Sequence, residues 1–454
     1  MHPDEIRTIF SRAMSDLYRT EVPQYGTLCD LVAKVNETAL ARDAHLARRM
    51  RRNGEIDRLE VERHGAIRLG TAAELATIRR LFALMGMKPV GYYDLSVAGV
   101  PVHSTAFRPI SDSSLEHNPF RVFTSLLRFE LIVDSELREI AQKILSKRKI
   151  FTARCLALLE QAELQGGLGS EDAREFVSEL LETFKWHREA TVDLATYRRL
   201  RAAHALVADI VCFRGPHINH LTPRTLDIDM VQEGMAASGL RAKDVIEGPP
   251  RRAFPILLRQ TSFLALEEAI RFVGVGGDGT HTARFGEVEQ RGCALTRKGR
   301  ALYDELLSKA RSTAPRSAIP DQELRRVFAD FPDDVKDLFN QGLAFVRFEV
   351  NAKRVAQESP PVGADARQLV AGGWLDLSPI TYEDFLPVSA AGIFRSNLGS
   401  EVRASYDAAG NQRDFEGALG APVLDEIALY EAAQASSFAA CEQQIRAMSA
   451  ADMA

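Results

Sequence analysis

The sequence contains few cysteines, and they are widely spaced. Its 454 residues include five, with no C-x-x-C pair among them: Cys29, Cys155, Cys212, Cys293 and Cys441. An odd number at such spacing is typical neither of a disulfide framework nor of a zinc knuckle. We therefore expect a protein of a reducing compartment, the cytoplasm.

Long apolar runs and an export signal are also lacking. The most apolar stretches, residues 126–133 and 203–213, are short and interrupted by charged side chains, whereas a membrane span needs about 20 consecutive apolar residues. Asp4 and Glu5 stand where a signal peptide would carry positive charge. These features predict a protein that binds no membrane and is not exported.

The chain has no excess of basic residues. Its 57 Lys and Arg face 62 Asp and Glu, a formal net charge of −5, while 46% of the residues are apolar. Such a chain can build a core of ordinary size but offers no positive field to phosphates. Nucleic acid is therefore not an expected partner.

Hydrophobic periodicity predicts a first β-α-β-β-β unit over about residues 55–132. Its helix begins at Thr71, with Glu74 completing a reciprocal cap. The strands are predicted over residues 56–69, 89–95, 100–107 and 120–132. Helices follow over about residues 134–213 and would cover the sheet.

A second, less regular β-α-β-β-β unit is predicted over about residues 217–295. It consists of an extended segment to about Thr225, a helix over 229–238, and strands around 254–262 and 281–289. Further helices and a strand over 343–350 follow a linker with Pro315 and Pro320, and the last helix begins near Val423. The predicted fold class is α+β, with two β-α-β-β-β modules and extensive helical additions.

His64 and Arg68 are the first residues that could carry chemistry. They lie four positions apart on the opening strand, so both side chains point to one face, and Gly65 and Ala66 leave room beside them. A hydrogen-bonded strand histidine with a surface arginine is the more ordinary interpretation of this local sequence.

The second unit opens with the same spacing, in His220 and Arg224. Two duplicated modules that each contribute one metal-binding histidine would give this pattern, although two residue types can recur by chance. His217 competes with His220 as a ligand, because this segment is too irregular to assign a face.

A carboxylate would complete a metal site, and Glu287 or Glu289 could supply it. Two acids separated by one residue usually mark a solvated strand face, and residues two apart share a face, so parity does not choose between them. Two neutral imidazoles and one carboxylate leave adjacent coordination positions open, as in non-haem Fe(II) enzymes.

Residues 274–279 match the G-x-G-x-x-G dinucleotide pattern. That loop requires a helix N-terminus directly after it, whereas residues 280–285 are predicted as a strand. We interpret the segment as a hairpin connection.

These residues lie within longer strings that identify the chain as similar to a known family, the bacterial 2-oxoadipate dioxygenase/decarboxylases, also called hydroxyglutarate synthases. The resemblance extends from the segment at Glu21 to the C-terminal helix. It includes Glu62-Arg63-His64-Gly65-Ala66-Ile67-Arg68, Gly91-Tyr92-Tyr93-Asp94-Leu95, Gly215-Pro216-His217-Ile218-Asn219-His220, Phe285-Gly286-Glu287 and Tyr382-Glu383-Asp384-Phe385-Leu386-Pro387-Val388-Ser389.

The resemblance implies an Fe(II) cofactor with His64, His220 and Glu287 as ligands, so that His217 and Glu289 become neighbours. It places substrate contacts at His64 and His220, and at three further positions: Arg68, the backbone of Val388, and Ser389. It also implies a fold similar to the vicinal-oxygen-chelate proteins, whose paired modules curl around a metal. Residues 1–454 would then form one enlarged catalytic domain, with a helical insertion over about 134–213 and a C-terminal extension over about 320–454 completing the site.

The implied reaction takes 2-oxoadipate and O2 to D-2-hydroxyglutarate and CO2, a step in lysine catabolism. Arg68 would hold the distal carboxylate of the substrate through a bidentate pair. The alternatives are a related metal-dependent dioxygenase or isomerase of another 2-oxo acid, or a catalytically silent metal- or ligand-binding protein. Nothing in the sequence predicts an oligomeric state.

Overall fold

The computed structural model describes residues 1–52, 54–274, 278–313, 319, 321–361, 363–386 and 408–451. They divide into two compact units. Unit 1 comprises Met1–Ile246, Gln260–Glu289 and Phe385–Leu424, and unit 2 comprises Glu247–Arg259, Gln290–Asp384 and Asp425–Ala454. Pro315, Pro320, Val388 and Ser389 lie outside the described residues.

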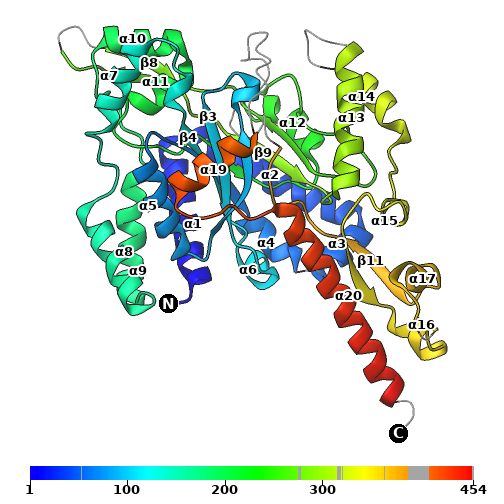
Figure 1. Cartoon of the computed structure of the whole chain (residues 1–454). Helices are drawn as coiled ribbons and strands as arrows, with labels where there is room; N and C mark the ends of the chain where they lie inside the picture. The colour runs from blue at the N-terminus through cyan, green and yellow to red at the C-terminus, as the bar shows by residue number, and fades with distance from the viewer. Residues whose placement is uncertain are drawn as a thin grey trace. The chain divides into compact units, whose positions relative to one another are not determined.

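Unit 1 is built on a five-stranded sheet with the strand order β2-β3-β4-β1-β5. Its strands β3 and β4 are labelled in Figure 1. β1 runs parallel to β4, and the other pairs are antiparallel. The strands are β1 (Arg63–Leu69), β2 (Lys88–Asp94), β3 (Val102–Arg108), β4 (Arg121–Leu127) and β5 (Leu221–Pro223). β1, α5 (Ala72–Ala83), β2, β3 and β4 follow one another in the predicted order, with the short helix α6 (Asp112–His117) added before β4.

Two boundaries of this first module differ from the prediction. Residues 56–61 are not a strand but part of the helix α4 (Glu55–Val61), which Arg58 stabilises through an ion pair with Glu62 four residues on. The last strand ends at Leu127 rather than Ile132, because the Arg128 side chain turns to pair with Asp94 and Glu130, and Phe129–Leu131 forms a 3-10 turn.

The second module is less regular than the first. β5 joins the sheet of the first module, whereas β6 (Leu258–Ser262) pairs with β9 (Glu287–Arg291) and β7 (Glu267–Arg271) pairs with β8 (Asp278–Thr282). α12 (Ile228–Ala237) is the predicted helix of this module.

The single strand predicted over residues 281–289 is wrong, because the chain leaves β8 at Thr282 and enters β9 only at Glu287. Arg284 lies in the gap and pairs with Glu21 and Glu268. Residues 275–277 of the Gly-rich segment lie outside the described residues, but the antiparallel strands β7 and β8 flank them, as expected of a hairpin connection.

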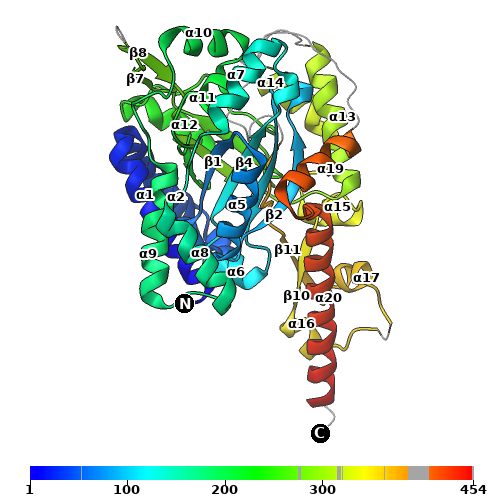
Figure 2. The same ribbon diagram turned by 60° about the vertical axis from the view of Figure 1, so that its left-hand side comes forward.

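Helices cover the sheet of unit 1 and form its core with it. The aromatic ring of Phe10 meets the rings of Phe82, Phe120 and Phe184 edge-on. Figure 2 shows α8 and α9 beside α1, and α5 against the strands. The helices are α1 (Pro3–Glu21), α2 (Pro23–Arg42), α3 (Ala44–Arg52), α7 (Ser135–Leu145), α8 (Ala153–Gln165), α9 (Ser170–Leu181), α10 (Leu194–Ala203), α11 (Ala205–Val211) and α19 (Ala408–Leu419).

Unit 2 has its own small core around the antiparallel pair β10 (Val346–Val350) and β11 (Leu375–Pro379). The C-terminal helix α20 (Glu426–Ala451) packs along β10, with Cys441 and Ile445 against Phe348. The remaining helices are α13 (Arg297–Thr313), α14 (Asp321–Val327), α15 (Val335–Asn340), α16 (Ala352–Gln357) and α17 (Ala366–Ala371).

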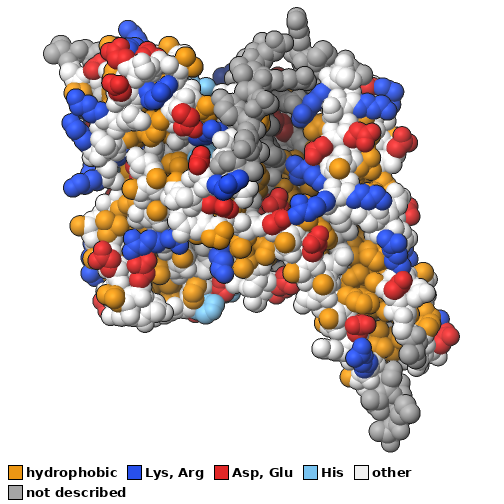
Figure 3. Space-filling model, viewed as in Figure 1, with side chains coloured by type: hydrophobic (Ala, Val, Ile, Leu, Met, Phe, Trp, Pro, Cys, Tyr) orange, Lys and Arg blue, Asp and Glu red, His pale blue; other side chains and the backbone are white. Residues whose placement is uncertain are grey.

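Among the described helices, none combines the length and the apolar character that crossing a bilayer requires. On the face shown in Figure 3, Lys and Arg side chains are interspersed with Asp and Glu. The charge on this face is therefore mixed, in keeping with the small formal net charge of −5.

Candidate metal centre

The structure brings His64, His220 and Glu287 together in unit 1. Their ligand atoms all lie within 4.8 Å of one another. His64 Nε2 is 3.0 Å and His220 Nε2 is 3.9 Å from Glu287 Oε1, and all three side chains are fully buried. The three residues are far apart in the sequence and lie on different segments. His64 belongs to β1, His220 directly precedes β5, and Glu287 is the first residue of β9.

Close packing of the backbone places the histidines side by side. A Cβ atom at Gly65 would lie 2.5 Å from Cδ1 of Ile218, so glycine lets the segment before β5 approach β1. The amide of Asn219 then donates to the carbonyl of Ala66 at 3.0 Å. His220 therefore lies beside the strand that carries His64.

The hydroxyl of Tyr18, on α1, lies at the junction of the two ligand-bearing segments of the second module. It is 3.0 Å from the carbonyl oxygen of Asn219 and 2.7 Å from that of Phe285. The amide of Phe285 in turn donates to the carbonyl of Asn219 at 3.2 Å. These contacts hold the residues that precede His220 and Glu287 against each other.

The two carboxylate oxygens of Glu287 have different surroundings. Oε1 accepts hydrogen bonds from Gln260 Nε2 at 2.7 Å and from Thr222 Oγ1 at 3.2 Å. Oε2 of Glu287 and both ring nitrogens of His220 are buried and make no hydrogen bond to any described residue. Leaving such a group unsatisfied costs about 1–3 kcal/mol. A metal ion would satisfy Oε2 of Glu287 and one ring nitrogen of His220, so the residues present fit a bound metal.

The protonation of His220 suits the same role. Burial lowers the pKa of His220 well below its ordinary value, and the charges of His64 and Arg68 lower it further. For His64, burial alone would lower the pKa, but the carboxylates of Glu289 and Glu287 outweigh burial and raise it. His220 is thus held neutral, the form in which imidazole binds a metal.

Glu289 is a neighbour of this group. Its Oε2 lies 2.9 Å from Nδ1 of His64, and the side chain is fully buried. A carboxylate beside Nδ1 favours a proton on that nitrogen, which would leave Nε2 to bind a metal. Glu287 and Glu289 therefore share a face, as their spacing requires, but contact opposite nitrogens of one imidazole.

Arg68 contacts a carboxylate that the sequence did not single out. Its Nη1 is 2.6 Å from Oδ2 of Asp209, on α11. Burial alone would raise the pKa of the Asp209 carboxyl, but the charges of His217 and Arg68, together with hydrogen bonds from His217 and His281, hold it well below its ordinary value. His217, the competing ligand candidate, lies 3.2 Å from Asp209 Oδ1 and outside the group formed by His64, His220 and Glu287.

Arg224 does not repeat the surroundings of Arg68, despite the repeated spacing. Its guanidinium pairs with Glu62 and Glu55, each at 3.0 Å, and is buried. Arg58 and Arg121 also pair with Glu62. The two arginines at the repeated spacing therefore differ: Arg68 lies near the candidate metal centre, and Arg224 belongs to a buried ion-pair network.

Phe385 places the start of a predicted substrate-binding segment beside the centre. Its ring meets His64 edge-on at a centroid distance of 5.0 Å, and its amide donates to the Tyr93 hydroxyl at 3.3 Å. Val388 and Ser389 follow a few residues later, outside the described part of the chain.

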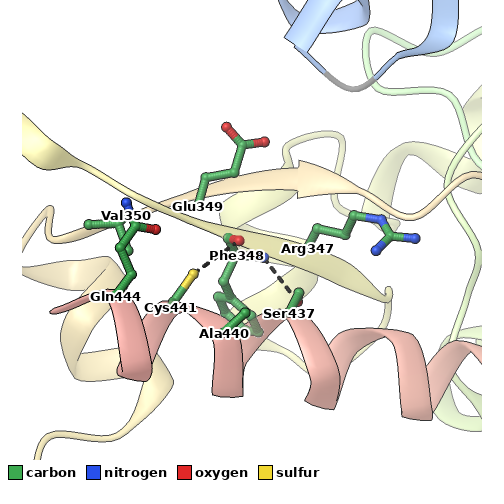
Figure 4. A pocket seen from close by; sticks show the side chains of 8 residues that line it. All are labelled: Arg347, Phe348, Glu349, Val350, Ser437, Ala440, Cys441 and Gln444. Atoms are coloured by element: carbon green, nitrogen blue, oxygen red, sulfur yellow. Dashed lines mark hydrogen bonds between the residues drawn. The ribbon is translucent and has the colours of Figure 1, made fainter. Parts of the chain in front are cut away.

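A cavity of about 420 Å³ lies elsewhere, in unit 2 (Figure 4). It is bounded by β10 and α20, where Cys441 Sγ and Ser437 Oγ are both 3.2 Å from the backbone of Phe348. Its lining residues are Arg347, Phe348, Glu349, Val350, Ser437, Ala440, Cys441 and Gln444. None of the candidate site residues belongs to it.

Sequence reasoning missed Asp209, Tyr18, Gln260 and His281. Only Asp209 carried a signal, since it interrupts the otherwise apolar run Ala205–Val211. A lone acid in an apolar helix is buried only when it is paired.

A mixed fold of helices and sheets that buries two imidazoles and one carboxylate defines a protein able to hold a metal ion with open coordination positions. The family model of the 2-oxoadipate dioxygenase/decarboxylases matches residues 10–397. The chain belongs to this family.

Curated relatives and solved structures agree with that assignment over nearly the whole chain. The 2-oxoadipate dioxygenase/decarboxylase of Escherichia coli (strain K12) is 57% identical over 96% of this chain and 98% of its own. The 2-oxoadipate dioxygenase/decarboxylase of Pseudomonas putida is 54% identical over 98% of this chain and 97% of its own. The crystal structure of hydroxyglutarate synthase from Pseudomonas putida in complex with 2-oxoadipate superposes with a TM-score of 0.90, at 53% identity, over 98% of this chain and 99% of that one.

Proposed function

We propose that this protein converts 2-oxoadipate and O2 to D-2-hydroxyglutarate and CO2. The single observation that carries the proposal is the buried group of His64, His220 and Glu287 in a chain that matches this family along nearly its full length. The equation balances without a further oxidant: CO2 leaves with the oxygens of the substrate's own carboxylate, one oxygen atom of O2 enters the new carboxylate at the former ketone carbon, and the other enters the new hydroxyl group.

The metal in this proposal is Fe(II), held by His64, His220 and Glu287. Bound there, Fe(II) would supply the redox chemistry with O2 and open positions for the 2-oxo acid. The unsatisfied nitrogens of His220 and the unsatisfied Oε2 of Glu287 support this ligand set. Gln260 and Thr222 orient Glu287 by holding its other oxygen.

The role of Arg68 in the proposal is to bind the distal carboxylate of the substrate. Arg68 lies four positions after His64 along β1, so their Cα atoms lie about 13 Å apart at about 3.3 Å per residue. A long side chain and an extended six-carbon diacid together span such a distance. The bidentate geometry of guanidinium and carboxylate would then select a diacid of this length.

The remaining parts of the proposed site come from the C-terminal region and the fold. We propose that the Val388 backbone and Ser389 contact the substrate, and the position of Phe385 beside His64 supports this. We also propose the vicinal-oxygen-chelate type of fold within one enlarged catalytic domain; the order of β1, α5, β2, β3 and β4 supports it. We propose a cytoplasmic location, which the five free cysteines support. We also propose lysine catabolism as the pathway, on the basis of the family resemblance.

Anaerobic reconstitution tests the proposal directly. The apoprotein receives Fe(II) and then 2-oxoadipate, and O2 is admitted while O2 uptake and CO2 release are measured. We expect equal amounts of O2 consumed and CO2 released, and a product with the mass and chirality of D-2-hydroxyglutarate.

Other outcomes identify the alternatives. Turnover without O2 uptake would indicate an isomerase, and turnover of another 2-oxo acid alone would indicate a different dioxygenase. No turnover with any 2-oxo acid despite full iron binding would indicate a silent binding protein.

A further inference from the structure

Asp209 stands at the centre of a buried polar cluster in unit 1. The Asp209 cluster, as we name it, consists of Arg68, Tyr197, Asp209, His217, Asn219 and His281. Asp209 is 6% exposed although it lies on a helix whose other residues from Leu206 to Val211 are all buried and apolar. A carboxylate in that position needs several donors.

Each oxygen of Asp209 has its own partners. Oδ1 lies 2.9 Å from Nε2 of His281 and 3.2 Å from Nε2 of His217. Oδ2 lies 2.6 Å from Nη1 of Arg68 and 3.4 Å from Nδ2 of Asn219. Two imidazoles therefore hold one oxygen, and the other faces the guanidinium.

Asp209 defines the direction of the hydrogen bonds at His281, because a carboxylate only accepts and Nε2 of His281 must donate to it. In the neutral ring Nδ1 then carries no proton. It therefore accepts from the Tyr197 hydroxyl, which lies 2.9 Å from Nδ1 and 3.4 Å from the carbonyl oxygen of Thr280. The chain of donors Tyr197 to His281 to Asp209 fixes the rotation of the carboxylate.

Aromatic rings prevent the two imidazoles from turning. The ring of Trp186 meets His217 edge-on at 4.6 Å and lies nearly parallel to His281 at 6.0 Å. Phe213 lies 4.6 Å from His281. The imidazoles that hold Asp209 are thus themselves held by packing.

We infer that Asp209 is a positioning residue, which fixes the Arg68 guanidinium in the orientation that receives the distal carboxylate of the substrate. The inference rests on the proposed function of Arg68. An arginine side chain has many rotamers, and a site that orders it before binding loses less entropy when the substrate arrives. Asp209 also balances the charge of Arg68, whose side chain is 11% exposed. The guanidinium has five donors, so further partners can bind the others.

The test compares a diacid with its monoacid analogue in the iron-loaded enzyme. Asp209→Asn keeps the shape of the side chain but removes its charge. We expect the KM for 2-oxoadipate to rise about tenfold or more while kcat stays within about threefold, and the iron content to remain that of the wild type. The inhibition constant of 2-oxohexanoate, which has a methyl group in place of the distal carboxylate, should not change.

Arg68→Gln and the double variant test whether Asp209 acts through Arg68. If it does, the double variant should resemble Arg68→Gln alone, with a KM within about twofold. Asp4→Asn is the matched control, because Asp4 and the buried Arg7 form another ion pair, at 2.6 Å, near the start of α1. This control should leave the KM for 2-oxoadipate unchanged even where it lowers the melting temperature.

Tyr197→Phe keeps the inference testable if Asp209→Asn does not fold. It removes only the hydroxyl that orders His281, and we expect a smaller rise in KM for 2-oxoadipate and none in the 2-oxohexanoate constant. The inference would be overturned if Asp209→Asn raised the KM for 2-oxoadipate and the inhibition constant of 2-oxohexanoate equally. It would also be overturned if the effects of Asp209→Asn and Arg68→Gln on the KM were fully additive. An Arg68→Gln enzyme with an unchanged KM would instead refute the role of Arg68, and a wild type without turnover of 2-oxoadipate would refute the proposed function itself.

Discussion

Glu287 and Glu289 differ at the scale of single atoms. Glu287 has one oxygen held by Gln260 and another without a hydrogen bond to described residues, whereas Glu289 contacts the far nitrogen of His64. We expect Glu287→Gln to lose iron and activity, since two remaining imidazoles hold Fe(II) poorly. Glu289→Gln should weaken iron binding by about 10- to 100-fold, as loss of a partner behind a ligand does, but remain active at saturating iron.

Iron titration followed by oxygen-uptake assays distinguishes the two glutamates. Both substitutions remove one negative charge from a buried strand, so each serves as the control for the other. Equal iron affinity in the two variants would contradict the assignment.

His217 and His220 provide a second contrast between neighbours. His220 carries two ring nitrogens without hydrogen bonds to described residues, whereas His217 faces Asp209. We expect His220→Ala to abolish iron binding and His217→Ala to retain full iron content, with only the KM for 2-oxoadipate raised through the Asp209 cluster. Loss of iron in His217→Ala together with retention in His220→Ala would reverse the ligand assignment.

His103 makes stability depend on pH. Burial, followed by the charge of Arg128, lowers its pKa from an ordinary 6.5 to about 4. The folded protein thus accepts this proton only near pH 4, whereas the unfolded chain accepts it near 6.5. Stability from this group is complete above pH 6.5 and is lost as the pH falls toward 4, by about 3 kcal/mol in total.

Denaturant unfolding at pH 7 and pH 5 measures this contribution. By pH 5 the loss at His103 is about 2 kcal/mol. His103→Phe, which keeps a ring against Phe415, should therefore lose about that much less stability than the wild type between the two pH values. An identical loss in both proteins would show that His103 titrates normally.

At the scale of elements, Gly286 controls how β9 begins. A Cβ atom at this position would lie 2.1 Å from Cε1 of Phe263, a ring that is only 2% exposed. We expect Gly286→Ala to destabilise the protein by about 1–3 kcal/mol, as overpacking does, and to displace Glu287 and so lower iron affinity. The free energy of unfolding and an iron titration measure the two effects.

Phe263→Leu supplies the control for this clash. Combined with Gly286→Ala it should recover part of both losses, because the smaller side chain vacates the space of the ring. If the pair is no better than Gly286→Ala alone, the effect arises from backbone freedom at position 286 rather than from contact with Phe263.

Elements with strong periodicity were predictable from the sequence, and those set by side-chain contacts were not. The cap at Thr71 and Glu74 located the start of α5 correctly. The strand predicted to begin at Ile56 failed because helix α4 depends on an ion pair between Arg58 and Glu62, within a network that includes distant Arg224. A buried ion-pair network leaves no periodic pattern.

The candidate site was also predictable only in part, because strand spacing leaves a pattern in the sequence and side-chain contacts between distant segments do not. Strand spacing placed His64 and Arg68 on one face, and resemblance to a family selected His220 and Glu287 from their neighbours. Asp209, by contrast, meets Arg68 only in the folded chain.

At the scale of the whole molecule, unit 1 gathers its candidate ligands from three distant segments. His64 belongs to the first module, and His220 and Glu287 to the second, with Tyr18 of the N-terminal helix joining the last two. Unfolding separates these segments, so an ion bound by all three binds the folded state alone.

Fe(II) should therefore stabilise the protein measurably. At a free concentration 100 times its dissociation constant, a ligand of the folded state adds about 2.7 kcal/mol, which corresponds to a rise of a few degrees in the melting temperature of an anaerobic sample. His220→Ala should show no rise. If unit 1 and unit 2 melt in separate transitions, only the transition of unit 1 should shift, because all three candidate ligands belong to it. An equal rise in His220→Ala, or a shift confined to unit 2, would mean that the stabilising iron binds elsewhere.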